Sequence, residues 1–567
     1  MVVSGCTVGV TKTATGVDET GANLRGDVFA TAAGEVDYWF KYGETTSYGE
    51  TSPTRTIAVS GQDTYKVAEP VGGLSPGTEY HFQLCVQHQT EEPDRVACVA
   101  DKTFTTATGP PTELSIEAEP GLYPEFSASA DDYVTRCDDD PVDVDVAAPP
   151  GTEVAVADAG ARSGRFAESV PLATGDAFTL TVTGEQAGTY HVRCLPTDFP
   201  DWTYSRAGQP SQQWTMLALS KGVARYVTFV DENATPVWWL SHARTPLDAK
   251  LLSDGNVAFA RGEATPFGQD DTAYEIHALD GSLLRTLVTV GSDTDHHDLQ
   301  ELPNGNYLMM TYRPRDHVDL SAHGGPADAT VLDAELQEVT PAGALVWSWN
   351  SKDHIALSET GPWWPTVRNQ PNRLRDGRMA YDIVHINAVE VDADGLLVSM
   401  RHTDGVYRIR RSDGQVLWKL GGTATPESLT VIGDPRTQTF SGQHDVRRLS
   451  DGSVTVYDNG TQAGRPPRAV RFQIDAGDAT ATWQEAIGDA DVNSSVCCGS
   501  ARKLDSGGWL VGWGSIVSPV IGEYAADGSR VFKLTYPNSF SYRAFPVPHG
   551  RVGPQQLRDA MDAMASD

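Results

Sequence analysis

Three segments of the chain place an imidazole or amide side chain at the same distance before the glycine of an Asp-Gly or Asn-Gly dipeptide. The distance is eight positions, and the pairs are His297 and Gly305, Asn387 and Gly395, and His444 and Gly452. His385 precedes Asn387 by two residues, so both side chains share one face if the segment is a strand. A lone histidine is more often structural, but this recurrence favours a functional site.

Arg401 follows Gly395 by six positions. In an antiparallel hairpin, residues similarly far before and after the turn lie opposite each other, so we expect Arg401 beside His385 and Asn387. A flanking segment has Leu247 at the equivalent position. The spacing therefore predicts one polar cluster at a single mouth of a repeat protein, formed by His297, His385, Asn387, Arg401 and His444.

These side chains suit a small anion with several oxygens. An arginine fork and imidazole N–H groups bind such oxygens through charge-assisted hydrogen bonds, and a neutral imidazole is also a nucleophile or base near neutral pH. The cluster lacks the paired carboxylates of glycoside hydrolysis, and the sequence has no GxSxG elbow, P-loop or dinucleotide fingerprint. Three histidines can bind a metal, but Arg401 would repel a dication, so we expect neither metal nor cofactor.

Other polar and aromatic features are weaker. Five histidines lack repeat equivalents, and we expect them to be structural: His296, His317, His323, His354 and His402. His296 adjoins His297, and the sequence leaves open which of the two faces the site. The stretch 362–365, Pro-Trp-Trp-Pro, either forms a wall or lid of the site or packs between repeats.

The elements that position the cluster recur along residues 199–550. Each unit has an apolar strand, a glycine turn and a second strand, and the turns include Gly255, Gly281, Gly305, Gly343, Gly395, Gly414, Gly452, Gly507 and Gly528. Asp-Gly between alternating strands indicates a hairpin, and repeats of roughly 40–60 residues with two hairpins are typical of propeller blades. With an incomplete unit near 213–240, the pattern predicts a six-bladed β-propeller.

Two more β-rich segments precede the repeats, so we expect an all-β chain throughout. Residues 1–109 alternate short apolar runs with turns and resemble a fibronectin type III β-sandwich. A Pro-Pro linker opens residues 110–198, which resemble a second, cadherin-like sandwich. After the propeller, residues 551–567 are expected to form an amphipathic helix with Leu557, Met561 and Met564 on one face.

Composition limits the possible partners. The 567 residues carry 43 Lys and Arg against 76 Asp and Glu, a net charge of −33. This acidity argues against nucleic acids and anionic membrane surfaces, and no apolar run approaches the ~20 residues of a membrane span. The apolar fraction of 40% and the 13 Trp provide for packed cores. We therefore expect folded domains that act on a small molecule, in an oligomeric state that the sequence does not define.

The seven cysteines bear on location. Cys85 and Cys98 flank a predicted hairpin, and Cys137 and Cys194 lie near the ends of the second sandwich, so each pair can form a disulfide; buried free thiols are the alternative. The adjacent Cys497 and Cys498 form a strained vicinal disulfide, pair elsewhere or stay free.

Disulfides favour an extracytoplasmic location, whether secreted, periplasmic or at the cell surface. Cys6 ends a Val-Ser-Gly-Cys string that resembles a lipoprotein cleavage box, although the charged and apolar regions that precede such a box are missing. Lipid anchoring at Cys6 is therefore one option, and a chance match is the other.

Three motifs resemble the bacterial arylsulfate sulfotransferase family. They are 296–305, 385–389 together with 397–402, and 443–452. The resemblance covers about residues 195–550, and it implies a six-bladed propeller that moves a sulfuryl group from an aryl sulfate to a phenol without a nucleotide donor. It also implies roles for the cluster: His444 as nucleophile, His297, His385 and Arg401 as groups holding the sulfuryl oxygens, and Asn387 as a site amide.

We thus expect an aryl sulfotransferase that works in two steps through a sulfohistidine, with an aryl sulfate donor and a phenolic acceptor as partners. A non-catalytic extracellular propeller that binds sulfated or other anionic glycans is the main alternative, with the sandwiches as stalks. A quinone-dependent propeller dehydrogenase lacks support, because the sequence has no repeated Trp docking motif.

Overall fold

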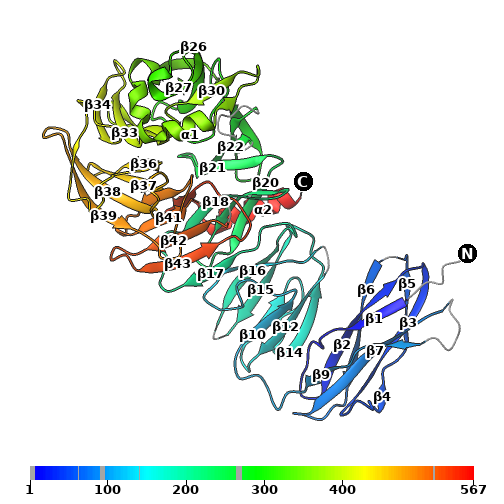
Figure 1. The fold of residues 1–567 in the computed structure, drawn as a ribbon. Helices are drawn as coiled ribbons and strands as arrows, with labels where there is room; N and C mark the ends of the chain where they lie inside the picture. Colours follow the sequence, from blue (N-terminus) through cyan, green and yellow to red (C-terminus); the bar gives the residue numbers. More distant parts are fainter. Residues whose placement is uncertain are drawn as a thin grey trace, which may run out of the picture. The chain divides into compact units, whose positions relative to one another are not determined.

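The computed structural model describes residues 7–61, 63–89, 96–138, 141–184, 186–262, 271–514 and 518–566. The prediction about Cys6 lies outside these residues. The chain divides into two compact units, Met1–Thr197 and Asp198–Asp567, and β-strands dominate each of them (Figure 1). The expected all-β class is confirmed. Within the described ranges, no helix is both long and apolar enough to cross a membrane.

The first unit begins with two sheets over one hydrophobic core. Their strands are β1 (Thr7–Thr11), β2 (Gly21–Ala30), β3 (Gly34–Gly43), β4 (Glu50–Thr51), β5 (Arg55–Val59), β6 (Asp63–Gly72), β7 (Glu79–His88), β8 (Ala97–Cys98) and β9 (Lys102–Thr105). The sheet orders are β1-β2-β6 and β4-β3-β7-β8, with β5 on β3 and β9 on β7. Leu24, Phe40, Phe82 and Leu84 are fully buried between them, because alternate residues of each strand face inward.

The same unit continues with a separate core between two more sheets. Their strands are β10 (Ser115–Glu119), β11 (Asp132–Thr135), β12 (Val142–Ala148), β13 (Glu153–Val156), β14 (Gly164–Val170), β15 (Ala177–Thr183) and β16 (Gly188–Cys194). The orders are β10-β12-β14 and β11-β16-β15-β13. The buried residues of this core include Val142, Val154, Leu180 and Val192.

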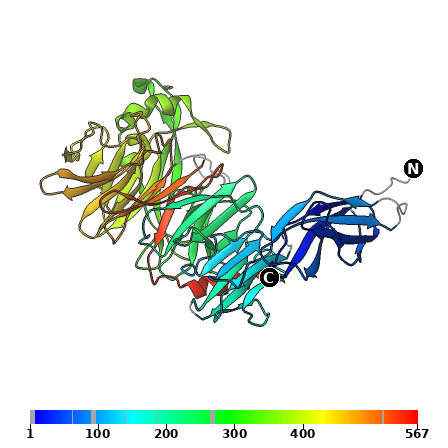
Figure 2. The same cartoon turned by 90° about the horizontal axis from the view of Figure 1, so that it is seen from below.

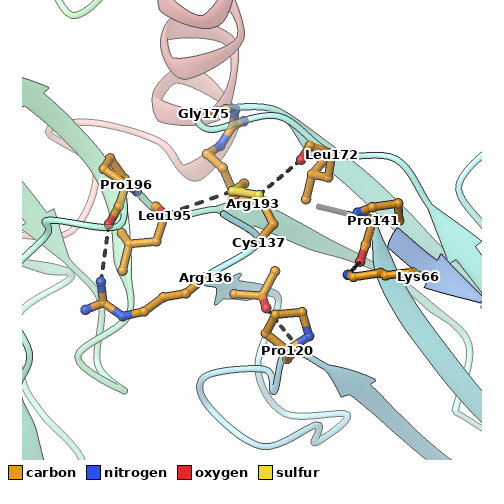
Figure 3. Close-up of a disulfide and its surroundings, with 12 residues drawn as sticks. Lys66, Pro120, Arg136, Cys137, Pro141, Leu172, Gly175, Arg193, Leu195 and Pro196 are labelled. Carbon is orange, nitrogen blue, oxygen red and sulfur yellow. Dashed lines mark hydrogen bonds between the residues drawn. A yellow bond between two sulfur atoms is a disulfide. The ribbon is translucent and has the colours of Figure 1, made fainter. Parts of the chain in front are cut away.

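A disulfide lies in each half of the first unit. Cys85 and Cys98 are direct partners on β7 and β8, with a Cα–Cα distance of 4.0 Å. Cys137 and Cys194 are 5.6 Å apart at Cα, and Figure 3 shows the surroundings of this bond, where Arg193 donates to the Gly175 carbonyl at 2.7 Å. Both predicted pairings are confirmed.

The second unit has six sheets among its described residues. In chain order, the first three are β20-β19-β18-β44, β21-β22-β23-β24 and β25-β26-β27-β30-β29 with β28 on β27. Their strands are β18 (Trp214–Lys221), β19 (Ala224–Val230), β20 (Pro236–Ser241), β21 (Thr245–Leu251), β22 (Val257–Gly262), β23 (Ala273–His277), β24 (Leu283–Leu287), β25 (Gln300–Glu301), β26 (Tyr307–Val318), β27 (Ala329–Val339), β28 (Leu345–Asn350), β29 (Asn372–Arg373), β30 (Met379–Asp382) and β44 (Ala544–Val547).

The other three sheets are β31-β32-β33-β34, β35-β39-β38-β37-β36 and β17-β43-β42-β41-β40. Their strands are β17 (Thr203–Arg206), β31 (Ile386–Asp392), β32 (Gly395–Met400), β33 (Gly405–Arg410), β34 (Val416–Gly421), β35 (Thr430–Ile432), β36 (His444–Arg448), β37 (Ser453–Asp458), β38 (Arg468–Asp475), β39 (Thr480–Ile487), β40 (Ser500–Lys503), β41 (Trp509–Trp513), β42 (Val520–Tyr524) and β43 (Arg530–Thr535). Pairing of β18 with β44 and of β17 with β43 ties the start of the unit to its end.

Helices are few and short. They are η1 (Ser321–His323), η2 (Ser351–Asp353), η3 (Leu357–Trp363), α1 (Trp364–Asn369), η4 (Arg401–Thr403) and α2 (Pro554–Ala565). The C-terminal α2, the red helix in Figure 2, buries Leu557, Ala560 and Met561. It packs on β20, where the Trp239 N–H lies 3.3 Å from Sδ of Met561.

One glycine turn differs from the others. Gly305 and Gly452 have φ values of 80° and 83°, which suit glycine. In the segment between them, Ala393 adopts the left-handed conformation with φ 51°, and Gly395 is already the first residue of β32. The turn is shorter in this segment, because Asp392 already pairs with Gly395. Asn387, eight positions before Gly395, therefore lies at a register shift between Ile386 and Ala388.

Candidate functional site

The predicted cluster lies at corresponding strand ends of three consecutive sheets. His297 precedes β25, His385 immediately precedes β31, and His444 is the first residue of β36. The ring centres of His297 and His385 are 5.1 Å apart. Arg401 begins η4 directly after β32, and its backbone N–H donates to the His385 carbonyl at 2.8 Å. The hairpin therefore places Arg401 opposite His385, because the two strands pair in antiparallel fashion.

His444 is held in one tautomer. Its Nδ1 lies 2.8 Å from Oδ1 of Asn459 and 3.0 Å from the Gly442 carbonyl, and both oxygens only accept hydrogen bonds. The neutral ring therefore carries its proton on Nδ1 and keeps a lone pair on Nε2, which accepts the Cys498 N–H at 3.2 Å. Burial and the charge of Arg401 hold the pKa of His444 well below its usual value, so the ring is neutral at neutral pH.

His297 is oriented by a buried carboxylate. Its Nδ1 lies 2.6 Å from Oδ1 of Asp295, which also accepts the backbone N–H of His297 at 2.9 Å. The neighbouring His296 stacks on His297 at 4.2 Å between ring centres, but only the ring of His297 adjoins His385. Burial lowers the pKa of His296 to about 3. Of the two adjacent histidines, His297 is thus the one in contact with the rest of the cluster.

His385 has a matching arrangement. Its Nδ1 lies 2.5 Å from Oδ2 of Asp382, and its backbone N–H donates to Oδ1 of the same carboxylate at 3.0 Å. Its φ of 50° is unusual for a residue with a Cβ, and the double contact with Asp382 stabilises it. Burial, followed by the positive charges of its neighbours, holds the pKa of His385 well below the ordinary value.

Arg401 is fixed from three sides. Its Nη1 donates to Nε2 of His402 at 2.9 Å and its Nη2 to the Val496 carbonyl at 2.8 Å. The guanidinium carbon lies 4.4 Å from the ring centre of Trp363, a cation–π distance. Nε is buried and has no hydrogen-bond partner among the described residues. The guanidinium therefore keeps one unsatisfied donor beside the cluster.

Asn387 is fully buried beside the residue that precedes His444. Its Nδ2 donates to the Gln443 carbonyl at 2.7 Å, and its backbone carbonyl accepts from Arg543 at 2.8 Å. Its Oδ1 is buried and has no partner among the described residues. The amide therefore positions the backbone that leads into His444.

Several residues of the site were not predicted. His402, expected to be structural, positions Arg401 and is itself held by the Asp382 carbonyl at 2.7 Å; burial lowers its pKa to about 3. Asp382, Asp295 and Asn459 orient the three imidazoles. Asp295 and Asp382 lie two and three residues before the histidines that they orient, so the sequence held this local signal, as it did for His402 beside Arg401. Asn459 is 15 residues from His444 and is brought in by the fold.

The two tryptophans of the stretch 362–365 have different contacts. Trp363 is 1% exposed, supports Arg401 and donates from Nε1 to Asp404 at 2.8 Å. Trp364 instead stacks on His323, with ring centres 4.4 Å apart. Of the two alternatives for this stretch, Trp363 fits the wall of the site and Trp364 fits packing.

Two groups of side chains in the described part of the chain have metal-ligand spacing. They are Asp295, His296 and His297, and Asp382, His385 and His402. In both groups a histidine Nδ1 faces the carboxylate. This contact is enough to orient the imidazole ring without a metal ion. A surface hollow of about 880 Å³ lies elsewhere, beside Trp347, Trp349 and Arg411, and contains none of the cluster residues.

Fold and site together define an all-β protein with buried imidazoles gathered around one guanidinium. The model of the Arylsulfotransferase (ASST) family matches residues 250–537, half of the chain. The chain belongs to this family, as the motifs predicted, and membership supports aryl sulfotransferase activity in general.

Other comparisons add little. No curated protein matches the chain. A protein of unknown function from Bacteroides caccae is 14% identical, with 59% of this chain and 99% of that chain covered and a TM-score of 0.34. TolB from Acinetobacter baumannii is 10% identical, with 60% and 68% covered and a TM-score of 0.33. Similarity at this level says nothing further about the present chain.

Proposed function

We propose that the protein transfers a sulfuryl group from an aryl sulfate to a phenol through a sulfohistidine on His444. The observation that carries the proposal is the state of His444: a buried neutral ring with its proton on Nδ1 and a lone pair on Nε2, near Arg401. A neutral imidazole attacks an electrophilic centre, whereas an imidazolium does not.

In the first step, the Cys498 N–H releases Nε2 of His444, Nε2 attacks sulfur, the N–S bond forms and the S–O(aryl) bond breaks. Nε of Arg401 stabilises the charge on the sulfuryl oxygens. His297 or His385, protonated at Nε2, gives this proton to the leaving aryl oxide, which departs as a phenol and leaves the ring neutral. A bound anion raises the pKa of nearby imidazoles, which favours these protonated donors.

In the second step, a phenol oxygen attacks sulfur and the N–S bond breaks. The phenol proton needs an acceptor, and Nε2 of His385 or His297 suits this role because Asp382 and Asp295 keep the proton of each neutral ring on Nδ1. The phenol released from the donor leaves before the acceptor binds, so we expect ping-pong kinetics.

The proposal includes the architecture and location. Six sheets, together with the pairing of the start of the second unit to its end, support a six-bladed β-propeller over about 199–550. The separate cores of the first unit support a fibronectin type III-like sandwich at 1–109 and a cadherin-like sandwich at 110–198. Two disulfides support an extracytoplasmic location.

Steady-state kinetics test the activity. With a nitrophenyl sulfate donor and varied phenol, we expect nitrophenol release that accelerates with phenol and parallel double-reciprocal lines. Saturable anion binding without turnover would instead favour the glycan-binding alternative. Intersecting lines would contradict the covalent intermediate, but they would still be consistent with transferase activity.

A further inference from the structure

We propose that Cys497 and Cys498 form a thiol-oxidation site that reacts with small disulfides, and that its oxidation slows the chemistry at His444. The first half concerns only the two thiols. The second half rests on the proposed function. Nothing in the mechanism above uses either sulfur.

The two thiols are placed to react with each other. Their Sγ atoms are 2.7 Å apart, and they are the free cysteines of the described residues. The loop that carries them is tightly fixed: Cys498 has φ 65° and Gly499 has φ 99°. A Cβ on the neighbouring Gly514 would lie 2.3 Å from the Cys497 carbonyl oxygen, so only glycine allows this approach.

The surroundings give the two sulfurs different tasks. Cys497 is partly exposed, and the hydrogen bond from Cys498 together with the charge of Arg401 lowers its pKa to about 7. Cys498 is buried, and its pKa is raised well above the ordinary value. An accessible thiolate attacks disulfides, whereas a buried thiol beside it resolves the product.

The reaction balances with a small disulfide, RSSR, as oxidant. The Cys497 thiolate attacks one sulfur, the S–S bond of RSSR breaks, and RS⁻ leaves to take up a proton. Cys498 then loses its proton and attacks Sγ of Cys497, releasing a second RSH. Two electrons pass from the two thiols to RSSR, and the protein gains one disulfide.

Closure of this bond affects the peptide that touches His444. The Cys498 N–H donates to Nε2 of His444, and the Cys498 carbonyl accepts from Nδ2 of Asn459 at 3.0 Å. Asn459 in turn bonds Nδ1 of His444. Adjacent Cα atoms are about 3.8 Å apart, whereas disulfides usually join Cα atoms about 4.4–6.8 Å apart. A disulfide between adjacent residues therefore strains the Cys497–Cys498 peptide, and we expect the hydrogen bond from its N–H to Nε2 of His444 to shift.

Redox titration of the full chain tests the proposal. The reduced protein is equilibrated in glutathione buffers of rising oxidised fraction, alkylated and digested with trypsin, and the peptide 472–502 is weighed. We expect it to lose two hydrogens, with no glutathione attached, and to regain them with reductant. Aryl sulfate turnover measured in the same samples is expected to fall at least about tenfold in the oxidised form and to recover on reduction, because small displacements of reacting groups cost large factors in rate.

Two matched variants identify the roles of the sulfurs. Cys498→Ser is expected to hold glutathione on Cys497 as a stable mixed disulfide, and Cys497→Ser to take up none. A peptide 472–502 that stays reduced in every buffer would overturn the thiol site whatever the activity. A disulfide that forms without any change in turnover would overturn its effect on His444. Disulfide formation in a protein with no turnover in either state would contradict the proposed function instead.

Discussion

Nδ1 of His385 lies 2.5 Å from Oδ2 of Asp382, and the same carboxylate accepts the backbone N–H of His385. A carboxylate in this position fixes the tautomer of the imidazole, and it stabilises the imidazolium that forms when Nε2 accepts a proton. The pair therefore links a buried aspartate, which no motif predicted, to the chemistry proposed for the cluster.

Replacing Asp382 tests this link. We expect Asp382→Asn to lower kcat by about 10²–10⁴, because an amide can also donate to Nδ1 and so stabilise the wrong tautomer. Steady-state turnover of a nitrophenyl sulfate with phenol measures the effect. The exposed Asp376, paired with Arg378, provides a matched control, and Asp376→Asn is expected to retain full activity. Equal activities of the two variants would contradict the role of Asp382.

Arg401→Lys separates geometry from charge. Lysine keeps one positive charge but cannot reach His402, the Val496 carbonyl and an oxyanion with a planar fork. We expect kcat/KM to fall by about 10²–10³, the cost of losing one preorganised donor. The exposed Arg378→Lys serves as the control, and an Arg401→Lys enzyme with unchanged kcat/KM would show that charge alone suffices.

Buried neutral histidines make the second unit sensitive to acid. Burial lowers the pKa of His296 and of His402 to about 3, below the unfolded value of about 6.5. Between these two values the unfolded chain binds more protons, so the free energy of unfolding falls as pH drops below 6.5, by up to about 1.4 kcal/mol per pH unit for each histidine. The pKa of Asp404 is raised to about 6, so the folded chain binds this proton more readily than the unfolded chain does. Asp404 therefore increases the free energy of unfolding as pH drops, and it offsets part of the effect of the histidines.

Urea unfolding at pH 7, 6 and 5 measures this dependence. We expect lower stability at each step, and a shallower slope for His296→Gln, because that variant has one fewer group to protonate. A free energy of unfolding that is constant or rises toward pH 5 would contradict the assignment of neutral buried rings.

The two disulfides of the first unit should differ in their effect on stability. Cys137 and Cys194 are separated by 57 residues and Cys85 and Cys98 by 13. Loop-closure entropy gives about 4 kcal/mol for the longer loop and about 3 kcal/mol for the shorter one. We expect the Cys137→Ala, Cys194→Ala double variant to lower the urea midpoint of the first unit more than the Cys85→Ala, Cys98→Ala variant. The reverse order would show that strain or packing outweighs chain entropy.

The sequence predicted the parts of the site that repeat. Turn glycines recur along the second unit, and side chains at equal distances before those turns lie at corresponding strand ends; His297 and His444 were found in this way. Arg401 was found because antiparallel pairing is symmetric about a turn. Asn387 shares the count, but the turn is shorter there and the Asn387 amide donates to the Gln443 carbonyl.

Residues that act through a neighbour had no such pattern. Asp382 lies three residues before His385, but the repeat count did not single it out. Asn459 and Trp363 come from a loop and an insertion, and only the folded chain brings them to the imidazoles. His402 was visible beside Arg401, yet its role follows from a hydrogen bond, not from its spacing. The hairpin turns indicated a series of antiparallel sheets, whereas the pairing of β17 with β43 joins segments too distant for local patterns.

The central claim is that Nε2 of His444 carries the sulfuryl group between donor and acceptor. Mixing the enzyme with nitrophenyl sulfate in the absence of phenol, quenching in alkali and digesting it gives peptides for mass spectrometry. The account predicts one sulfuryl adduct on His444 that disappears when phenol is added before the quench, and no adduct in His444→Ala. An active enzyme whose His444 is never modified, or a His444→Ala variant with full transfer activity, would contradict it.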